Sequence, residues 1–316
     1  MADQAGLIER GVIGGSRSRA GVMHGRIAPE RMFPAADPRF VTTYHTLALR
    51  TGPATVRVIE CGDPDAARVV FCVHGWACSV YSYRRLMPLL ARAGMRAVAL
   101  DLPGHGLSDK PSCPALYTLD AQSEAVLAAM DAAGVSRAVL VGHSMGGPIC
   151  ARTAVLAPER VAALALLAPA GFGTEWDLRF LRGLTPRVVA PVLPYLLRRW
   201  MIAAVLAFAY GRLYRPSSRD VDEYWAPSQF PGFVGAMWDL LHRFEWDAGV
   251  DAGFGTITMP TIILDGRLDN LVLRRWVERY AAVLPNAMFE TIENCGHVVP
   301  EEAPELVAAA IGTLIN

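Results

Sequence analysis

The chain has 316 residues, 53% hydrophobic and 19% charged, and its 30 basic residues balance 30 acidic ones. This balance excludes a nucleic-acid partner, because binding to phosphates requires a concentrated positive field. The length allows a large core or one domain with a sizeable insertion, and the high hydrophobic content predicts apolar surface in a cleft or an interface.

Cysteine usage indicates the compartment. None of the 6 cysteines belongs to a C-x-x-C pair or has metal-ligand spacing with a histidine. We therefore expect free thiols, a reducing and cytoplasmic location, no metal and no cofactor. Residues 1–10 contain Asp3, Glu9 and Arg10 and lack the apolar segment of a signal peptide, which favours the same location.

Residues 1–38 combine several glycines with arginines such as Arg17, Arg19 and Arg26. This composition predicts a loosely ordered, mildly basic N-terminal extension. Two alternatives stay open: the extension folds over the body as a lid, or it mediates self-association.

Residues 39–172 and 257–316 are predicted to form one core. Strands at 41–49 and 54–61 form an antiparallel pair, and strands and helices alternate afterwards. The further strands are expected at 68–73, 96–100, 137–141, 161–167, 260–264 and 287–292, and the helices at 81–93, 119–133, 148–157, 274–284 and 304–314. Continuous apolar strands separated by amphipathic helices predict an α/β fold, with a mostly parallel sheet covered on both faces.

Residues 173–256 interrupt the alternation and are predicted to form a helical cap inserted after the sixth strand. Prolines at 186, 191 and 194 break its helices. Its apolar run 200–210, which arginines flank, is too short to cross a bilayer and is expected to be a buried or substrate-facing cap helix. A contact with a membrane surface and a subunit interface, in a monomer or a homodimer, are the alternatives.

The sequence Gly142-His143-Ser144-Met145-Gly146 has the form G-x-S-x-G and stands between a predicted strand and a predicted helix. A strand that turns sharply into a helix strains the residue at the turn, and side chains two positions away on either side would collide with the backbone. The pattern predicts that Ser144 is an exposed nucleophile beside a helix N-terminus.

A serine nucleophile needs a base and an anion that orients the base. His297 follows the last strand, at the sheet edge where the carboxyl ends of parallel strands gather, and is predicted to be the base. Asp265 and Asp269 both follow the preceding strand, and we prefer Asp269 because it lies beyond the turn at Gly266.

An oxyanion requires preorganised donors. We expect these to be the backbone N–H groups of Met145, directly after the nucleophile, and of Trp76, in the loop after the 68–73 strand. The predicted substrate pocket comprises Trp76, His143, Trp200, Phe208, Trp225, Trp238 and Val298.

Several separate segments together resemble the α/β-hydrolase superfamily, in the subgroup with a serine nucleophile and a helical cap. They are residues 142–146, 74–76, 101–109, 266–269 and 296–297, and the resemblance covers roughly residues 41–316. It implies an eight-stranded sheet and the chain order Ser, Asp, His. It also implies that His74 and His105 are structural, with the His74 ring bracing the oxyanion loop.

The resemblance implies a cofactor-independent hydrolase of carboxylic esters with an acyl-enzyme on Ser144. Relatives that dehalogenate or open epoxides through an alkyl-enzyme place Asp at the nucleophile position, so Ser144 disfavours both reactions. C–C bond hydrolysis, thioester or lactone hydrolysis, acyl transfer and perhydrolysis stay open, as do an interfacial lipase and a ligand-binding protein with little turnover. The aromatic cap favours a small lipophilic ester as substrate.

Overall fold

A computed structural model describes residues 28–35, 37–173, 181–186, 197–247, 249 and 252–314. Eight strands form one sheet in the order β1-β2-β4-β3-β5-β6-β7-β8. Their bounds are β1 (Phe40–Leu49), β2 (Gly52–Cys61), β3 (Val69–Val73), β4 (Arg96–Leu100), β5 (Ala138–His143), β6 (Val161–Leu167), β7 (Thr261–Gly266) and β8 (Ala287–Ile292). Strand β2 is antiparallel to both β1 and β4, and every other neighbouring pair is parallel. The predicted mostly parallel, eight-stranded sheet is confirmed.

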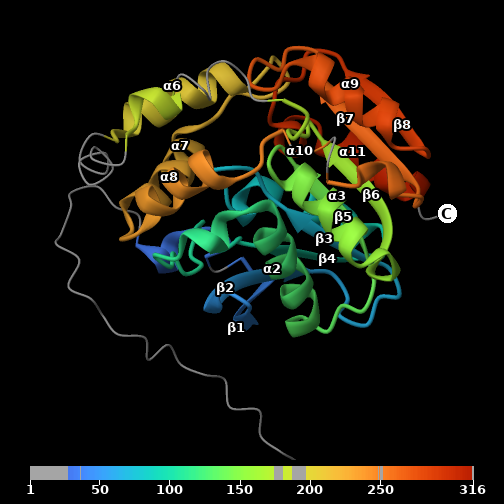
Figure 1. Cartoon of the computed structure of the whole chain (residues 1–316), viewed down its shortest axis with the longest axis horizontal. Coiled ribbons are helices and arrows are strands. Elements are labelled where there is room, and N and C mark those ends of the chain that lie inside the picture. The colour runs from blue at the N-terminus through green and yellow to red at the C-terminus, as the bar shows by residue number, and fades with distance from the viewer. Residues whose placement is uncertain are drawn as a thin grey trace, which may run out of the picture.

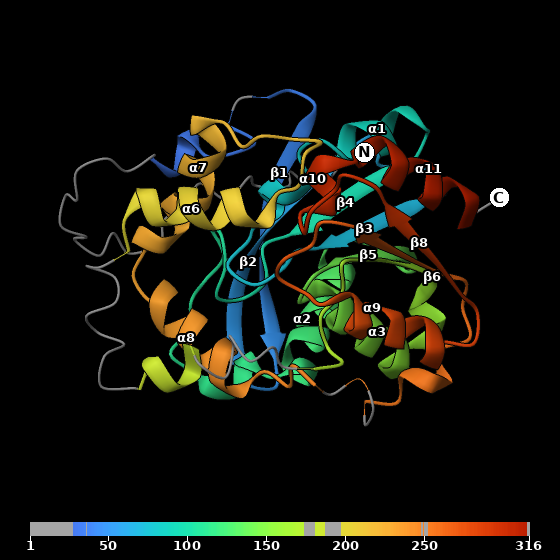
Figure 2. The same cartoon turned by 90° about the horizontal axis from the view of Figure 1, so that it is seen from above.

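Helices cover both faces of the sheet (Figures 1 and 2). The α-helices are α1 (Met87–Arg92), α2 (Leu119–Ala132), α3 (Gly146–Leu156), α6 (Arg199–Ala209), α7 (Ser218–Trp225), α8 (Phe233–Arg243), α9 (Arg274–Val283), α10 (Val299–Glu302) and α11 (Pro304–Leu314). Short 3-10 helices are η1 (Pro29–Arg31), η2 (Val80–Tyr83), η3 (Pro114–Tyr117), η4 (Pro158–Arg160), η6 (Ala226–Gln229) and η8 (Phe254–Thr256). One hydrophobic cluster joins α2, α3 and α9 to the sheet, and a second joins α1 and α11 to the opposite face.

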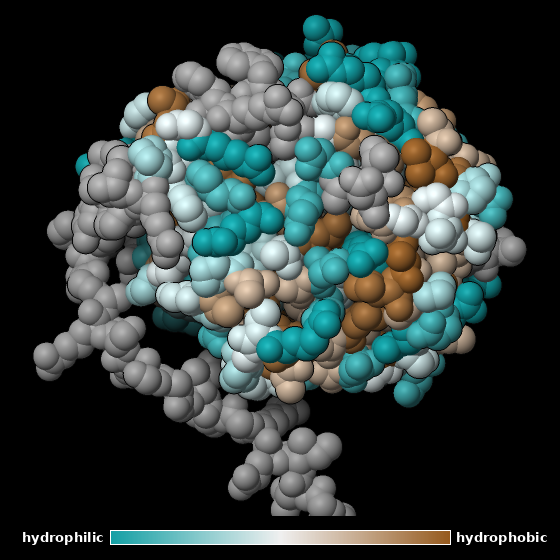
Figure 3. All heavy atoms as spheres, viewed as in Figure 1, coloured by the Kyte–Doolittle hydropathy of each residue, from teal (hydrophilic) through white to brown (hydrophobic). Residues whose placement is uncertain are grey.

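The central strands are continuously apolar because both of their faces are buried. In β3, Phe71 contributes to the first cluster and its neighbour Cys72 to the second, as the alternation of side chains along a strand requires. Strand β5 divides in the same way between Leu140 and Val141. The face of the molecule in Figure 3 mixes hydrophilic and hydrophobic residues.

Two predicted helices differ from the observed ones by more than one residue at an end. The helix expected at 81–93 is divided into η2 and α1, and Pro88 lies in the first turn of α1. Proline lacks an N–H group, and a first helical turn tolerates this best. Helix α3 begins at Gly146 rather than at residue 148, so the helix follows the strand with only two residues between them.

Part of the predicted N-terminal extension packs on the molecule, and residues 1–27 and 36 lie outside the described residues. Met32 is buried, and the Phe33 ring contacts the rings of Phe40 and Tyr81. The Phe33 N–H donates to the Glu223 carboxylate of α7 at 2.8 Å. For residues 29–35 the structure therefore corrects the expectation of loose order, and these residues fold over the body.

Helices α6, α7 and α8 lie between β6 and β7 in the chain, and we call the described residues 197–247 the cap. Figures 1 and 2 show them grouped at one side of the sheet. None of the described helices combines the length and apolar character needed to span a membrane. The exact division into a core and an insertion of residues 173–256 stays a prediction.

A buried ion pair fixes the loop after β4. The side chains of Arg57 and Asp101 are 2% and 0% exposed, with 2.7 Å between Nη2 and Oδ2. The Asp101 carboxylate also accepts hydrogen bonds from the N–H groups of Val80 and Leu107. Asp101→Ala is expected to lower the free energy of unfolding by about 3–5 kcal/mol, because it leaves a buried guanidinium without its counter-charge.

Denaturant unfolding measures this loss, and Asp131→Ala is the matched control. Asp131 pairs with Arg160 but is 65% exposed, so its removal is expected to change stability by less than about 1 kcal/mol. Equal effects of the two substitutions would contradict a stabilising role for the buried pair.

Candidate active site

Ser144 occupies the turn between β5 and α3. Its φ of 53° lies in the left-handed region, where a residue other than glycine is strained. The backbone is held there because the Ser144 N–H donates to the carbonyl of Leu167 at 2.9 Å, and its own carbonyl accepts from Gly147 at 2.9 Å. Both chain neighbours of Ser144 are buried, whereas Ser144 itself is partly accessible.

Gly142 and Gly146, the two glycines of the G-x-S-x-G sequence, lie very close to other backbone atoms. A Cβ on Gly142 would overlap the carbonyl group of Gly146, and a Cβ on Gly146 would overlap the carbonyl oxygen of Val73. Helix α3 thus begins so close to β5 and to the neighbouring strand β3 that only glycine fits at either position. This geometry agrees with the strained turn expected from the sequence.

Asp269 and His297 are paired on neighbouring loops. Asp269 Oδ2 lies 2.8 Å from His297 Nδ1, and the two side chains are 3% and 7% exposed. The other carboxylate oxygen, Oδ1, accepts from the N–H groups of Leu271 and Val272 at 2.7 and 3.0 Å. The carboxylate is thereby held in place, and it orients the imidazole through Nδ1 and leaves Nε2 for chemistry.

The environment of His297 favours its protonated form. Burial lowers the pKa of the imidazole, but the charge and the hydrogen bond of Asp269 outweigh burial, so the pKa lies above its usual value. A base with this property accepts a proton from a hydroxyl more readily than a free imidazole does.

Asp265, the other carboxylate considered from the sequence, lies within β7 and is buried. Burial, together with the negative charge of Asp269, raises its pKa to about 7. Its Oδ1 has no hydrogen-bond partner among the described residues. Of the two carboxylates, the structure therefore pairs Asp269 with the imidazole.

His143 connects the serine turn to the histidine loop. Its Nε2 donates to the carbonyl oxygen of His297 at 2.9 Å, and the two ring centroids lie 4.9 Å apart. Burial, and secondarily the charge of His297, lowers the pKa of His143 to about 3, so this ring stays neutral. The ring is buried and supports the loop that carries His297, and its predicted place in the substrate pocket stays a prediction.

In the described part of the chain, the Ser144 hydroxyl makes no hydrogen bond, to His297 or to any other group. Such a bond often tightens only when substrate is present. The roles of Ser144, His297 and Asp269 as nucleophile, base and orienting acid therefore stay a prediction, supported by the pairing of the last two.

Two unused backbone donors flank Ser144. Within the described ranges, neither the N–H of Met145 nor that of Trp76 donates to a protein group. The loop that carries Trp76 lies against the serine, since a Cβ on Gly75 would stand only 3.0 Å from the Ser144 Cβ. Ala77 has a φ of 57°, which marks a sharply turned loop. The arrangement suits the binding of an oxyanion.

His74 and His105 lie beneath this loop. His74 Nδ1 donates to the Gly75 carbonyl at 2.8 Å, and its Nε2 accepts from the Leu102 N–H at 3.1 Å. The ring of His105 meets that of His74 edge to face at 4.8 Å. Both rings are fully buried, and burial lowers both pKa values. They act as neutral braces, as the resemblance implies.

The residues predicted to line the pocket separate into two groups. Trp76 is partly buried and meets Trp246 edge to face at 6.0 Å. Trp225 donates to the Leu197 carbonyl, Trp238 donates to that of Thr185 and stacks on His242, and Val298 packs against α6 and α7. The last three residues therefore have packing roles within the cap or between the cap and the histidine loop.

Trp200 and Phe208 are 69% and 54% exposed, and their predicted place in the substrate pocket stays a prediction. Helix α6 buries Leu206 and Ala209 instead, one helical turn apart. Helix α6 lies at the surface, so one of its faces points outward, and its almost uniformly apolar sequence does not specify which face.

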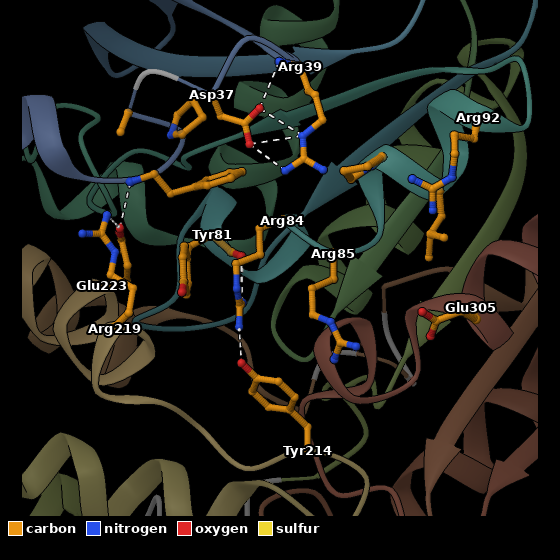
Figure 4. Close-up of a pocket in the computed structure, with 15 residues that line it drawn as sticks. Asp37, Arg39, Tyr81, Arg84, Arg85, Arg92, Tyr214, Arg219, Glu223 and Glu305 are labelled. Carbon is orange, nitrogen blue, oxygen red and sulfur yellow. Dashed lines mark hydrogen bonds and ion pairs between the residues drawn. The ribbon is translucent and has the colours of Figure 1, made fainter.

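A cavity of about 610 Å³ lies outside this site, between residues 33–35, 37 and 39, η2, α1 and α7 (Figure 4). Arginines contribute most of its charge: Arg39, Arg84, Arg85, Arg92 and Arg219. Three of them already pair with carboxylates, Arg39 with Asp37, Arg84 with Asp220 and Glu301, and Arg219 with Glu223. None of Ser144, Asp269 and His297 lines it. No pattern in the sequence predicts this set of ion pairs.

Comparisons with known proteins agree with the fold. A family model described as "alpha/beta hydrolase fold" matches residues 68–304. "Uncharacterized hydrolase YugF" of Bacillus subtilis is 30% identical over 257 residues, which cover 79% of this chain and 90% of that protein.

Two further proteins are similar over most of their length. "Epoxide hydrolase A" of Mycobacterium tuberculosis is 28% identical over 303 residues, covering 83% of this chain and 94% of that protein. Among solved structures, Cfl2 from Burkholderia cenocepacia has a TM-score of 0.76 at 23% identity, covering 89% of this chain and 98% of the other. At this identity, the structural likeness concerns the fold alone.

Proposed function

The chain belongs to the α/β-hydrolase family, and from this premise we propose that it is a serine hydrolase that cleaves carboxylic esters. One observation carries the proposal: the strained Ser144 stands beside the unused N–H groups of Trp76 and Met145, within the same site as the paired Asp269 and His297. Nucleophile, base, orienting acid and oxyanion donors are the groups that acyl transfer requires.

In the proposed reaction, the Ser144 hydroxyl oxygen attacks the ester carbonyl carbon and its proton passes to Nε2 of His297. The carbonyl oxygen becomes an oxyanion that accepts hydrogen bonds from the N–H groups of Trp76 and Met145. Asp269 stabilises the imidazolium. The carbon–oxygen bond to the leaving alcohol then breaks, and the alcohol takes the proton from His297.

Water completes the cycle. It gives a proton to His297 and attacks the acyl-enzyme, and the second tetrahedral intermediate releases the carboxylic acid as Ser144 recovers its proton. Thioesters, lactones and carbon–carbon bonds next to a carbonyl fit the same sequence of steps.

Epoxide opening is the alternative suggested by the relative named for that activity. Opening an epoxide through an alkyl-enzyme ester uses a carboxylate nucleophile, and this chain has a hydroxyl at that position. Mass spectrometry after treatment with a fluorophosphonate probe tests the proposal directly. A phosphonylated Ser144 is the expected result, and turnover of styrene oxide without labelling of Ser144 would favour the alternative.

We expect the acyl preference to reflect an apolar pocket beside Trp76 and Trp246. With p-nitrophenyl esters from acetate to hexanoate, kcat/KM should rise about fourfold for each methylene that becomes buried. Strict preference for acetate would contradict a large apolar pocket.

Longer esters also test whether the exposed face of α6 contacts lipid. Trp200, Val205 and Phe208 are exposed on it. A jump in activity above the solubility limit would indicate binding of this face to lipid aggregates, and hyperbolic kinetics through that limit would argue against it. The cytoplasmic location stays a prediction, which the six free cysteines favour.

A further inference from the structure

The end of helix α6 is hydrogen-bonded to the loop that carries His297. The His297 N–H donates to the Ala209 carbonyl at 2.7 Å, and the Arg212 N–H donates to the Asn294 carbonyl at 2.6 Å. Side chains would not fit between the two segments, because a Cβ on Gly211 would stand 2.5 Å from the Gly296 nitrogen. The cap and the histidine loop are therefore in direct backbone contact.

One carboxylate bridges the two segments. Glu302, at the end of α10, accepts from the Gly296 N–H through Oε1 at 2.9 Å and from the Gly211 N–H through Oε2 at 2.8 Å. Its side chain is almost fully buried. Each carboxylate oxygen thus binds one segment, and the single carboxylate keeps the Gly211 and Gly296 N–H groups close together.

The same end of α6 also contacts the loop of the acid. The Asn270 side-chain amide donates to the Phe208 carbonyl at 3.2 Å. Val298 packs with Leu206 in an apolar cluster, against which Leu271 also lies. The loops that carry Asp269 and His297 therefore share one support, which the cap provides.

The neighbouring Glu301 anchors the cap from the other side of α10. Its carboxylate accepts from the hydroxyl groups of Tyr210 and Tyr224 in the cap and pairs with Arg84 of the core. Arg84 also pairs with Asp220 of α7, and Figure 4 shows the Arg84 guanidinium beside Tyr81 and Tyr214. The cap is therefore attached firmly to the core at this edge.

We propose that Glu302 is a positioning residue for His297: by joining Gly296 to Gly211 it holds the imidazole in place for Ser144. The inference rests on the proposed hydrolase function. It also implies that the cap cannot move away from the core at the end of α6 without moving the base.

The first test compares Glu302→Gln and Glu302→Ala with Glu305→Gln. Glutamine keeps one acceptor and places an NH2 group against an N–H donor, so it breaks one of the two bonds, and alanine breaks both. Glu305 lies in the first turn of α11 and is exposed, so its variant is the control. We expect kcat to fall about tenfold for Glu302→Gln and about 100-fold for Glu302→Ala, with little change in KM.

A second pair of variants leaves the charge of the protein unchanged. It tests the same contact if the Glu302 variants do not fold. Gly211→Ala pushes the cap away from the histidine loop, whereas Gly235→Ala in α8 places its methyl group in open space. We expect Gly211→Ala to slow the fluorophosphonate reaction at Ser144 at least tenfold and Gly235→Ala to leave it unchanged.

The imidazole itself provides a readout that does not depend on turnover. The groups that surround His297 are Asp269, Asp265 of β7, the neutral His143 of β5 and Glu302, whose charges, except for that of His143, favour the imidazolium. An NMR titration of the ring should therefore give a lower pKa in Glu302→Gln than in Glu305→Gln.

Equal labelling rates and equal imidazole pKa values in Glu302→Gln and Glu305→Gln would overturn the proposal. Failure of the hydrolase proposal looks different: the wild-type protein would then not react with the probe. In that case the imidazole titration still shows whether Glu302 acts on the ring.

Discussion

Ser144→Ala is expected to lower kcat for a p-nitrophenyl ester by about six orders of magnitude. Without the hydroxyl no acyl-enzyme forms, so water must attack the bound ester directly. Residual activity would come from the N–H groups of Trp76 and Met145, which the substitution leaves in place. A spectrophotometric assay with enzyme in excess measures the difference.

The substitution should not disturb the fold, because the Ser144 hydroxyl makes no hydrogen bond within the described residues. The thermal midpoint is therefore expected to stay close to the wild-type value. Ser136→Ala, on an exposed turn, is the matched control and should retain full activity. Near-normal turnover by Ser144→Ala would contradict the proposal that Ser144 is the nucleophile.

The features that follow local rules were predictable from the sequence. Continuous apolar runs in β3 and β5 follow from a sheet buried on both faces, and the bounds of β6, β8 and α11 were predicted to the residue. The strain at Ser144 also follows locally, since Gly142 and Gly146 are needed only where a strand meets a helix at very short range. These rules concern residues that are close in the chain.

The features that depend on distant contacts were not predictable. Glu302 bonds to Gly211, 91 positions away, and Arg84 bonds to Asp220, 136 positions away. The sequence around each of these residues does not predict its partner. The orientation of α6 has the same origin: its apolar residues fit either face, and packing on Val298 selects Leu206 for the buried one.

The choice between Asp265 and Asp269 depends partly on local sequence and partly on a distant contact. The sequence places both after the penultimate strand, and only the course of the loop decides between them. A Cβ on Gly266 would overlap the Gly296 carbonyl, so the two loops cross in close contact at this glycine. Beyond the crossing, Asp269 reaches Nδ1 of His297, whereas Asp265 stays within β7.

Asp269→Asn is therefore expected to lower kcat by about 10⁴-fold, as for the same change in other serine triads. The asparagine amide would donate to Nδ1, which moves the ring proton to Nε2 and removes the lone pair that accepts the serine proton. Asp265→Asn is the matched control. Asp265, with a pKa of about 7, is partly neutral at neutral pH, and asparagine resembles this form, so activity should stay within about threefold.

The pH dependence separates the two carboxylates further. Neutral imidazole is the base, so kcat/KM falls as the pH drops through the pKa of His297, which Asp269 raises above the usual value of 6.5. Removing the charge of Asp269 lowers this pKa, so the acidic limb of the residual activity should move to lower pH while its maximum decreases. A 10⁴-fold loss in Asp265→Asn with an unchanged Asp269→Asn would instead make Asp265 the orienting acid, and the loop would then have to rearrange around Gly266 before catalysis.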